Sequence, residues 1–228
     1  MIIWHGSRIV YQVVTTREVK VSEMNYSVIT RATCAASYKE TALELMDGFA
    51  NDLRDQAEAA LVRYGYFGTG PGAGDLFFVQ NYRDLAGFDK AQEVYATSPS
   101  YKSFSQSGKV SIALRNIIKI IPIMFDATPD LNPKYLVLTK GATDPANKDE
   151  VVNHLQQATG LFSENGALTL RFGQIITGGN VGQMLLAASY LSMEAIEKTY
   201  DALNGSQIFK DLYQLVDVNR REIIRLIG

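Results

Sequence analysis

The chain has 228 residues, 46% hydrophobic and 20% charged, and a formal net charge of −2. This composition is typical of a soluble globular protein and fits one large domain or two small ones. The weak negative charge gives no electrostatic case for nucleic-acid binding, which needs a basic surface. The single cysteine, Cys34, excludes an intramolecular disulfide and a multi-cysteine zinc site, and only two histidines are present. We therefore expect neither a metal nor another cofactor.

Residues 1–23 are interpreted as an N-terminal extension. They lack the basic start, apolar core and cleavage site of a signal peptide. Apolar residues alternate between Ile9 and Val21, which would suit an extra edge strand; alternatively, Met24 is the natural start. No run approaches 18 uncharged apolar residues, so no transmembrane helix is predicted. The lone cysteine favours a reducing cytoplasm as the location.

The first half of the chain, residues 24–124, predicts the order strand, helix, strand, strand, helix, strand. Residues 25–33 are rich in β-branched side chains, which favours a strand. A helix follows, and Ser37 with Glu40 three residues later has the spacing of a capping box. Its apolar stripe recurs at three- and four-residue intervals. The stripe consists of Leu43, Met46, Phe49, Ala50, Leu53 and Ala57.

The remaining elements of this half surround a glycine-rich turn, GTGPGAG. Strands are expected at 60–67 and 76–82, and the second is apolar at most positions, which predicts cover on both faces. A second apolar helical stripe spans Leu85 to Tyr95. A short helix at 101–105 and a strand at 111–122 close the half.

Residues 125–133 are proline-rich and polar and are interpreted as a linker. The second half, residues 134–228, predicts the same order of elements. Strand patterns occupy 134–142, 167–177, 182–190 and 218–227, and helical patterns occupy 147–162 and 192–203.

The two halves are copies of one unit. Residues 63–104 align with residues 171–212 without a gap at an offset of 108. Shared positions include Arg63/Arg171, Thr69/Thr177, Gly70/Gly178, Gly74/Gly182, Tyr82/Tyr190, Ser98/Ser206 and Lys102/Lys210. The outer strands repeat at offsets of 109 and 106, which match Thr30 with Thr139, Arg31 with Lys140 and Arg115 with Arg221. Self-similarity of this kind indicates an internal duplication.

A β-α-β-β-α-β unit is ferredoxin-like, with a four-stranded antiparallel sheet and both helices on one face. The apolar strands leave the other face in need of cover, and the twin sheet can supply it. We therefore predict an α+β protein in which two tandem ferredoxin-like repeats form an internal pseudo-dimeric α/β barrel with its helices outside. Such a barrel either fills with side chains or holds one small ligand. A cavity well under about 300 Å³ would be too small for a typical substrate pocket.

The arrangement resembles the dimeric α/β barrel superfamily, which includes antibiotic-biosynthesis monooxygenases, haem-degrading monooxygenases, chlorite dismutases, muconolactone isomerase and NIPSNAP-like proteins. The local resemblance is to the NIPSNAP-like group, through GYFGTGPGAG followed by LFFVQNYRDLAGFDKAQEVYATSPSYKSF. It covers both halves as a pattern, more weakly in the second, and its motifs are structural. It implies a small-molecule-binding protein and leaves open whether a homodimer forms.

Three functions remain open. The first is a cofactor-independent, monooxygenase-like enzyme on an aromatic substrate. The second is a non-catalytic binding or interaction module with a filled barrel. The third is haem binding through His154, for which the alternative is a partly exposed helix histidine.

Arg63 and Arg171 are the leading ligand-binding candidates. Facing the interior, two guanidinium groups could bind a carboxylate or phenolate; facing outward, they would pair with acidic residues. Tyr82 and Tyr190 end the third strand of each unit and could orient a ligand or simply pack. Asn81 interrupts an apolar strand and has a smaller counterpart in the second half, which suits one active barrel mouth or drift after duplication. The glycine-rich turns join strand to strand, so we expect hairpins and not phosphate cradles.

Overall fold

The structure is a computed structural model that describes residues 24–125, 128 and 132–228. The edge strand considered between Ile9 and Val21 lies outside these residues. The first unit contains β1 (Tyr26–Cys34), α1 (Lys39–Gln56), β2 (Leu61–Phe67), β3 (Leu76–Tyr82), α2 (Leu85–Thr97), α3 (Pro99–Gln106) and β4 (Val110–Ile121). The second contains β5 (Tyr135–Thr143), α4 (Lys148–Glu164), β6 (Ala167–Thr177), β7 (Met184–Tyr190), α5 (Met193–Gly205), α6 (Gln207–Leu215) and β8 (Val216–Leu226).

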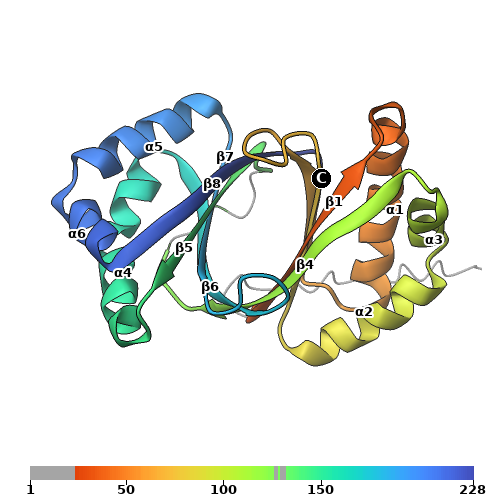
Figure 1. Ribbon diagram of the computed structural model, residues 1–228, viewed down its shortest axis with the longest axis horizontal. Helices are drawn as coiled ribbons and strands as arrows, with labels where there is room; N and C mark the ends of the chain where they lie inside the picture. The colour runs from red at the N-terminus through yellow and green to blue at the C-terminus, as the bar shows by residue number, and fades with distance from the viewer. Residues whose placement is uncertain (1–23, 126–127, 129–131) are drawn as a thin grey trace, which may run out of the picture.

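The strands form one closed antiparallel barrel in the order β1-β3-β2-β8-β5-β7-β6-β4, and β4 returns to β1. Each unit contributes four neighbouring strands, and the units meet at two seams, β2 with β8 and β4 with β6. Helices α1, α2 and α3 cover one outer side and α4, α5 and α6 cover the other (Figure 1). The predicted tandem ferredoxin-like barrel is confirmed.

The duplication places equivalent residues at the same end of the barrel. Strands β2 and β6 are four steps apart in a ring of eight, so they occupy opposite walls. Because every neighbouring pair is antiparallel, an even number of steps makes β2 and β6 run in the same direction. Side chains at matched positions therefore enter the interior at the same level from opposite sides.

Two matched glycines allow the seams to close. Gly65 pairs with Leu226 at one seam, and a Cβ on Gly65 would overlap the carbonyl oxygen of Arg225. Gly173 pairs with Ile120 at the other seam, where a Cβ would lie 2.7 Å from the carbonyl oxygen of Lys119. Backbones this close tolerate only glycine.

The glycine-rich turn after β2 lies over β8 of the other unit. The amide of Gly68 donates to the carbonyl oxygen of Ile223 at 2.7 Å, and the amide of Ile223 donates to Thr69 Oγ1 at 2.8 Å. Gly70 and Gly74 have φ values of 85° and 97°, which glycine adopts without strain. The prediction of a strand-to-strand hairpin is confirmed, and the turn also satisfies backbone groups of β8.

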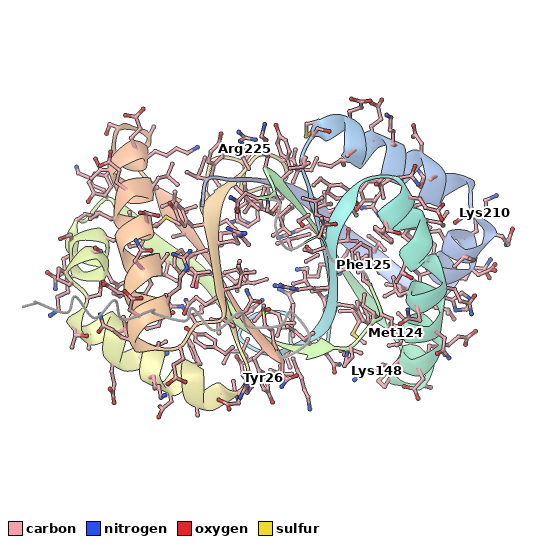
Figure 2. All side chains as sticks on the ribbon, turned by 180° about the vertical axis from the view of Figure 1, so that it is seen from behind. Tyr26, Met124, Phe125, Lys148, Lys210 and Arg225 are labelled. Carbon is pink, nitrogen blue, oxygen red and sulfur yellow. The ribbon has the colours of Figure 1, made fainter. Side chains whose placement is uncertain are left out.

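Apolar side chains fill the space between the sheet and the helices. All seven residues of β3 are buried, as the apolar pattern predicted. Met124 and Phe125 follow β4 (Figure 2), and Gln156 of α4 accepts from the Met124 amide at 2.7 Å and donates to its carbonyl at 3.0 Å. These bonds fix the chain as it leaves the first unit.

Two local expectations need correction. Ser37 does not cap α1, because it lies in a short 3₁₀ turn and the helix begins at Lys39 without a side-chain cap. Helix α6 was not anticipated; Ser206 caps it by accepting from the amide of Phe209. Among the described residues, no helix is long and apolar enough to cross a membrane.

Candidate functional site

The barrel encloses a cavity of about 240 Å³ lined by residues from most of its strands. Alternate residues of each strand point inward, as the two-residue period of a strand requires. Its apolar wall includes Ile29, Phe77, Val79, Leu136, Leu138 and Ala187. The volume is slightly below the lower limit of about 300 Å³ for typical ligand pockets.

The cavity exists because the second unit carries smaller inward side chains. At matched positions of β3 and β7, Phe77 corresponds to Leu185 and Val79 corresponds to Ala187. Gly173, required at the seam, adds a further position without a side chain. The space therefore opens against the wall of the second unit.

One end of the cavity is polar and contains three of the predicted residues, Arg63, Arg171 and Asn81. Arg171 Nη1 donates to Asn81 Oδ1 at 3.2 Å, and Ser27 Oγ donates to the same oxygen at 2.5 Å. Asn81 Nδ2 donates to the Leu61 carbonyl at 3.2 Å. Asn81 is thus fixed by its own sheet and reaches across the barrel to hold Arg171.

Arg63 has no equivalent partner. The residue matched to Asn81 is Ser189, whose hydroxyl bonds to Thr169 Oγ1 at 2.6 Å and, within the described part of the chain, makes no hydrogen bond to Arg63. Among the described residues, the Arg63 side chain makes one long hydrogen bond, from Nη2 to Asn132 Oδ1 at 3.4 Å. The two arginines occupy matched positions in the sequence, but only Arg171 is held by a side chain from the opposite sheet.

Among the described residues, the positive charge of this end has no acidic partner. Within the described residues, no Asp or Glu lies within salt-bridge distance of Arg63 or Arg171. Burial lowers the pKa of Arg171 to about 10, and the nearby charge of Arg63 acts in the same direction. Burial and then the charge of Arg54 lower the pKa of Arg63. Both groups remain cationic at neutral pH, so the cavity is suited to an anion.

Tyr82 and Tyr190 do not line this cavity. Tyr82 follows Asn81 directly, so its side chain points to the opposite face, toward the helices. Its hydroxyl donates to Gln80 Oε1 at 2.6 Å, and Gln80 Nε2 donates to the hydroxyl oxygen of Tyr95 at 2.6 Å. Tyr190 is fully buried in the corresponding core of the second unit. Burial raises the pKa of both tyrosines, so both remain neutral phenols.

His154 lies on α4, outside the barrel. Its Nδ1 is 2.9 Å from the Glu150 carbonyl oxygen of its own helix, and it lines none of the described cavities. A cavity of ~150 Å³ holds benzene, so a haem of about forty non-hydrogen atoms needs roughly 1,000 Å³. The enclosed cavities are far smaller, and the residues around His154 do not fit haem.

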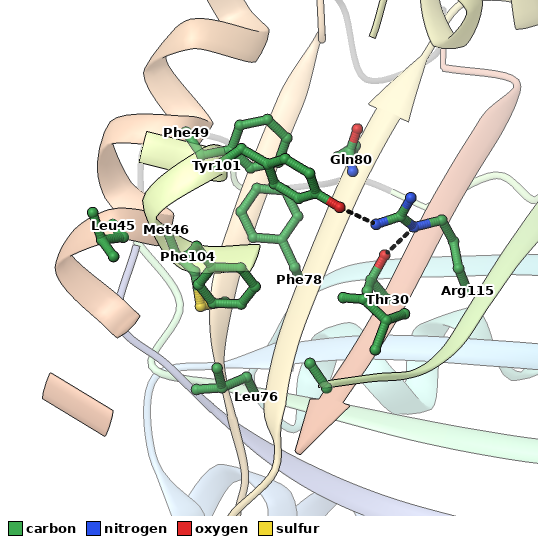
Figure 3. A pocket seen from close by; sticks show the side chains of 12 residues that line it. Thr30, Leu45, Met46, Phe49, Leu76, Phe78, Gln80, Tyr101, Phe104 and Arg115 are labelled. Carbon is green, nitrogen blue, oxygen red and sulfur yellow. Dashed lines mark hydrogen bonds between the residues drawn. The ribbon is translucent and has the colours of Figure 1, made fainter. Parts of the chain in front are cut away.

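A smaller cavity of about 30 Å³ lies between the sheet and helices of the first unit (Figure 3). Arg115 points toward it, donating from Nε to Thr30 Oγ1 at 3.1 Å and from Nη2 to the Tyr101 hydroxyl at 3.4 Å. Its guanidinium also lies 4.6 Å from the centre of the Tyr95 ring. The space is too small for a substrate, and most of its lining is apolar.

The second unit repeats this arrangement around Arg221. Its Nε donates to Thr139 Oγ1 at 3.2 Å, its Nη2 donates to the Tyr213 hydroxyl at 2.8 Å, and its guanidinium lies 4.3 Å from the Tyr200 ring centre. The match of Arg115 with Arg221 thus reflects a shared link between sheet and helices.

The site also contains residues that the sequence did not single out. Ser27, Thr169 and Ser189 join Asn81 at the polar end. Ser27 pairs with Asn81 across the sheet, Thr169 lies two residues before Arg171 on its strand, and Ser189 is the duplicate of Asn81 and pairs with Thr169. That spacing was the available signal, but short hydroxyl residues are common on strands.

Comparisons with known proteins place this geometry in a family. The model of the family described as Domain of unknown function (DUF6854) matches residues 24–120 and again residues 133–226. No curated protein matches this chain in sequence.

Solved structures share the fold at low identity. A "putative monooxygenase" from Fusobacterium nucleatum subsp. nucleatum has a TM-score of 0.66 and 13% identity, covering 90% of this chain and 93% of its own. A "putative monooxygenase" from Lactobacillus acidophilus has a TM-score of 0.61 and 16% identity, with the same coverage. A heme-binding protein from Thermus thermophilus has a TM-score of 0.57 and 10% identity, covering 90% of this chain and 92% of its own.

These structures establish the dimeric α/β barrel fold for the chain. The repeated match of the sequence model goes further, because it covers most of both ferredoxin-like units. The protein is therefore a member of the DUF6854 family that carries two copies of the family's domain in one closed barrel.

Proposed function

We propose that the barrel binds a small anionic molecule with an apolar body, whose acid group lies between Arg171 and Arg63. The observation that carries this proposal is the absence of an acidic partner for either arginine among the described residues. The other described residues that line the cavity carry no titratable side chain. A ligand is thus the natural source of the missing negative charge.

The chemistry of guanidinium favours an oxyanion. Two planar donors facing each other across a barrel can bind a carboxylate or phenolate with several charge-assisted hydrogen bonds. The apolar wall strengthens these bonds because it excludes water. Asn81 keeps Arg171 in place before the ligand arrives, which lowers the ordering cost of binding.

The volume limits the size of the ligand. Scaling from the ~150 Å³ cavity that holds benzene, about 240 Å³ accommodates roughly ten non-hydrogen atoms. A single-ring acid fits this space, and a three-ring molecule does not. The open volume also counts against a barrel filled by its own side chains.

Calorimetric titration with benzoate and with the neutral isostere benzamide tests the proposal. We expect binding of benzoate and at least tenfold weaker binding of benzamide. Arg171→Met should abolish the preference for the anion. Ala187→Val should weaken both ligands, because it introduces the residue of the matched position, Val79, and fills the cavity without changing its charge. Equal affinity for benzoate and benzamide, or unchanged benzoate binding in Arg171→Met, would contradict the proposal.

A second candidate function is oxidation of such a ligand by O₂, and the two similar structures described as monooxygenases favour it. The arginine pair could stabilise a phenolate, but the described lining offers no acid–base side chain other than arginine. The substrate would therefore have to ionise readily itself. In a balanced reaction, a phenol with a free para C–H and O₂ give a quinone and water, so no external reductant is needed. Oxygen uptake with single-ring phenols tests this, and uptake that persists in Arg171→Met would contradict a role for the cavity.

A further inference from the structure

The barrel end opposite the arginine pair contains a second polar cluster. Arg31, Asn116, Lys140 and Glu222 come from four different strands and line a further void of about 60 Å³. In the duplication, Arg31 matches Lys140 and Asn116 matches Glu222. Both units thus keep a cation at this end, and among the described residues that line the void the carboxylate comes from the second unit.

One carboxylate oxygen of Glu222, Oε1, is buried and has no hydrogen-bond donor among the described residues. Its residue exposure is 7%, and Oε1 is sealed from solvent and has no hydrogen-bond partner within the described chain. The nearest cation among the described residues is Arg31, whose Nη1 lies 3.9 Å away, beyond hydrogen-bond distance. Arg31 Nε is instead bonded to Asp75 at 2.6 Å. The ion pair with Arg31 supplies charge but no hydrogen bond, and a buried oxygen without a donor is costly, so a donor from a ligand would stabilise the Glu222 carboxylate.

Other charges also face this void. Lys140 and Arg220 both line it, and among the described residues neither side chain makes a hydrogen bond or ion pair. Burial lowers the pKa of Lys140, and the charge of Arg220 does so further, while Glu222 opposes the shift. None of these cations lies within hydrogen-bond distance of Glu222 Oε1 among the described residues, so that oxygen is left free to accept.

The two voids lie end to end inside the barrel. Four aliphatic residues, Ile29, Ile118, Leu138 and Leu185, line both of them. Along β1, Ser27 marks the arginine end and Arg31 marks the opposite end, four residues apart. At about 3.3 Å per residue this is ~13 Å along the strand, or roughly 10 Å along the axis of a barrel with tilted strands.

We infer that the ligand of this barrel is bifunctional: an acid group binds Arg171 and Arg63, and a hydroxyl at the far end of a rigid apolar body donates to Glu222. The inference rests on the proposed function and specifies its ligand class. The voids of about 240 and 60 Å³ together suit roughly twelve non-hydrogen atoms. That is the size of a hydroxyaryl acid with a short spacer between ring and carboxylate.

The energetic reason is selectivity against ligands without the donor. A site that contains a buried acceptor rejects an analogue lacking the hydroxyl, because the acceptor then stays unpaired. A hydroxyl bonded to an ionised carboxylate forms one of the stronger kinds of hydrogen bond. We expect the far group of the ligand to determine specificity, whereas the arginine pair provides general attraction for acids.

Three probes separate the two ends: cinnamate, 4-hydroxycinnamate and the nearly isosteric 4-methylcinnamate. With the natural chain, titration should show at least tenfold tighter binding of 4-hydroxycinnamate than of 4-methylcinnamate. Glu222→Met should remove this preference while cinnamate affinity stays within about threefold. Glu222→Gln retains an uncharged acceptor and should keep only part of the preference. The shorter 4-hydroxybenzoate, measured against 4-methylbenzoate, should gain little from its hydroxyl.

The outcomes distinguish this inference from the proposed function. If cinnamate binds but the hydroxyl gives no preference, or if Glu222→Met retains the preference, the bifunctional ligand is wrong and anion binding stands. If neither cinnamate nor benzoate binds, the proposed function itself fails. Should Glu222→Met not fold, the ratio of the two affinities in Glu222→Gln decides, since a general loss of stability does not change that ratio.

Discussion

At the scale of single residues, the duplication makes each unit a reference for the other. Arg63 and Arg171 are matched, yet only Arg171 is held by a side chain from the opposite sheet, because the position of Asn81 is occupied by Ser189 in the second unit. One arginine is thus preorganised, and the other can adjust to the ligand. The Arg171 side of the cavity is therefore fixed before a ligand binds, whereas the Arg63 side can move.

Asn81 should control the charge of the site. Asn81→Asp places a carboxylate beside Arg171 and supplies the missing counter-charge, so we expect benzoate affinity to fall at least tenfold. Asn81→Ser copies the second unit, removes the hold on Arg171 but adds no charge, and should reduce affinity only about threefold. Titration of both variants with benzoate provides the measurement. An Asn81→Asp variant that binds benzoate as well as Asn81→Ser would show that the anion lies elsewhere.

Arg171 should reduce the stability of the unliganded protein. Its pKa in the fold, about 10, is below the usual arginine value, so the folded state disfavours the charged form. The penalty is present at all lower pH values and disappears as the pH rises from about 10 toward the usual arginine value. Arg171→Met removes it, and we expect the free energy of unfolding at pH 7 to rise by about 1 kcal/mol, with loss of benzoate binding.

Chemical denaturation at pH 7 provides this measurement. Arg115→Met is a suitable control, because Arg115 bonds to Thr30 and Tyr101 between sheet and helices and should lose stability on substitution. If Arg171→Met loses as much stability as Arg115→Met, Arg171 does not lower the free energy of unfolding, and the prediction is wrong.

At the scale of strands and turns, the seams determine whether the barrel closes. The β2–β8 seam has only three paired positions among the described residues, and Gly65 is one of them. The turn after β2 adds hydrogen bonds to Ile223 just beyond these pairs. The glycines that the repeats share therefore serve strand contact and turn geometry, and the structure gives them no role in phosphate binding.

Gly65→Ala should destabilise the protein by about 3 kcal/mol, because the new methyl group would overlap the Arg225 carbonyl and push the strands apart. Gly173→Ala should cost less, since one of its contacts is the side chain of Ile118. Gly205→Ala is the matched control, because nothing lies within 4 Å of its added methyl group. Thermal unfolding of the three variants should follow this order, and equal effects of Gly65→Ala and Gly205→Ala would contradict it.

At the scale of the whole molecule, each unit covers the sheet of the other. The interior cluster that includes Phe67, Phe77 and Val79 from the first unit also includes Leu138 and Ile224 from the second. A unit on its own would expose this apolar face and two unpaired sheet edges. Such edges and faces drive self-association.

An isolated first unit, residues 24–124, should therefore form a dimer that rebuilds both seams with two identical copies. In the full chain, the second unit takes the place of the second copy, and the sheets of the two units close into one barrel. Analytical ultracentrifugation at several concentrations provides the measurement, with the full chain as reference. A stable, folded monomer of residues 24–124 would show that the seams are not needed for stability.

The sequence alone determined the duplication, the order of strands and helices, and the closed barrel, because these follow from apolar periodicity and from two sheets that each need one cover. It also proposed Arg63, Arg171 and Asn81 as ligand-binding candidates, and the tertiary structure brings these three together in one cavity. It could not decide which face of a strand is inside. Asn81 and Tyr82 are neighbours on β3 and must point to opposite faces, so at most one of them could line the cavity.

The tertiary structure decided the remaining features. The volume of the cavity depends on which side chains face one another across the barrel, among them Phe77, Val79 and Ala187. Ala187 is far from the other two in the sequence, so no local sequence pattern gives the volume. Glu222 looks like an ordinary charged residue of a half-exposed strand. Only the closure of eight strands buries it opposite the arginines, because burial and the lack of a partner arise from distant residues brought together.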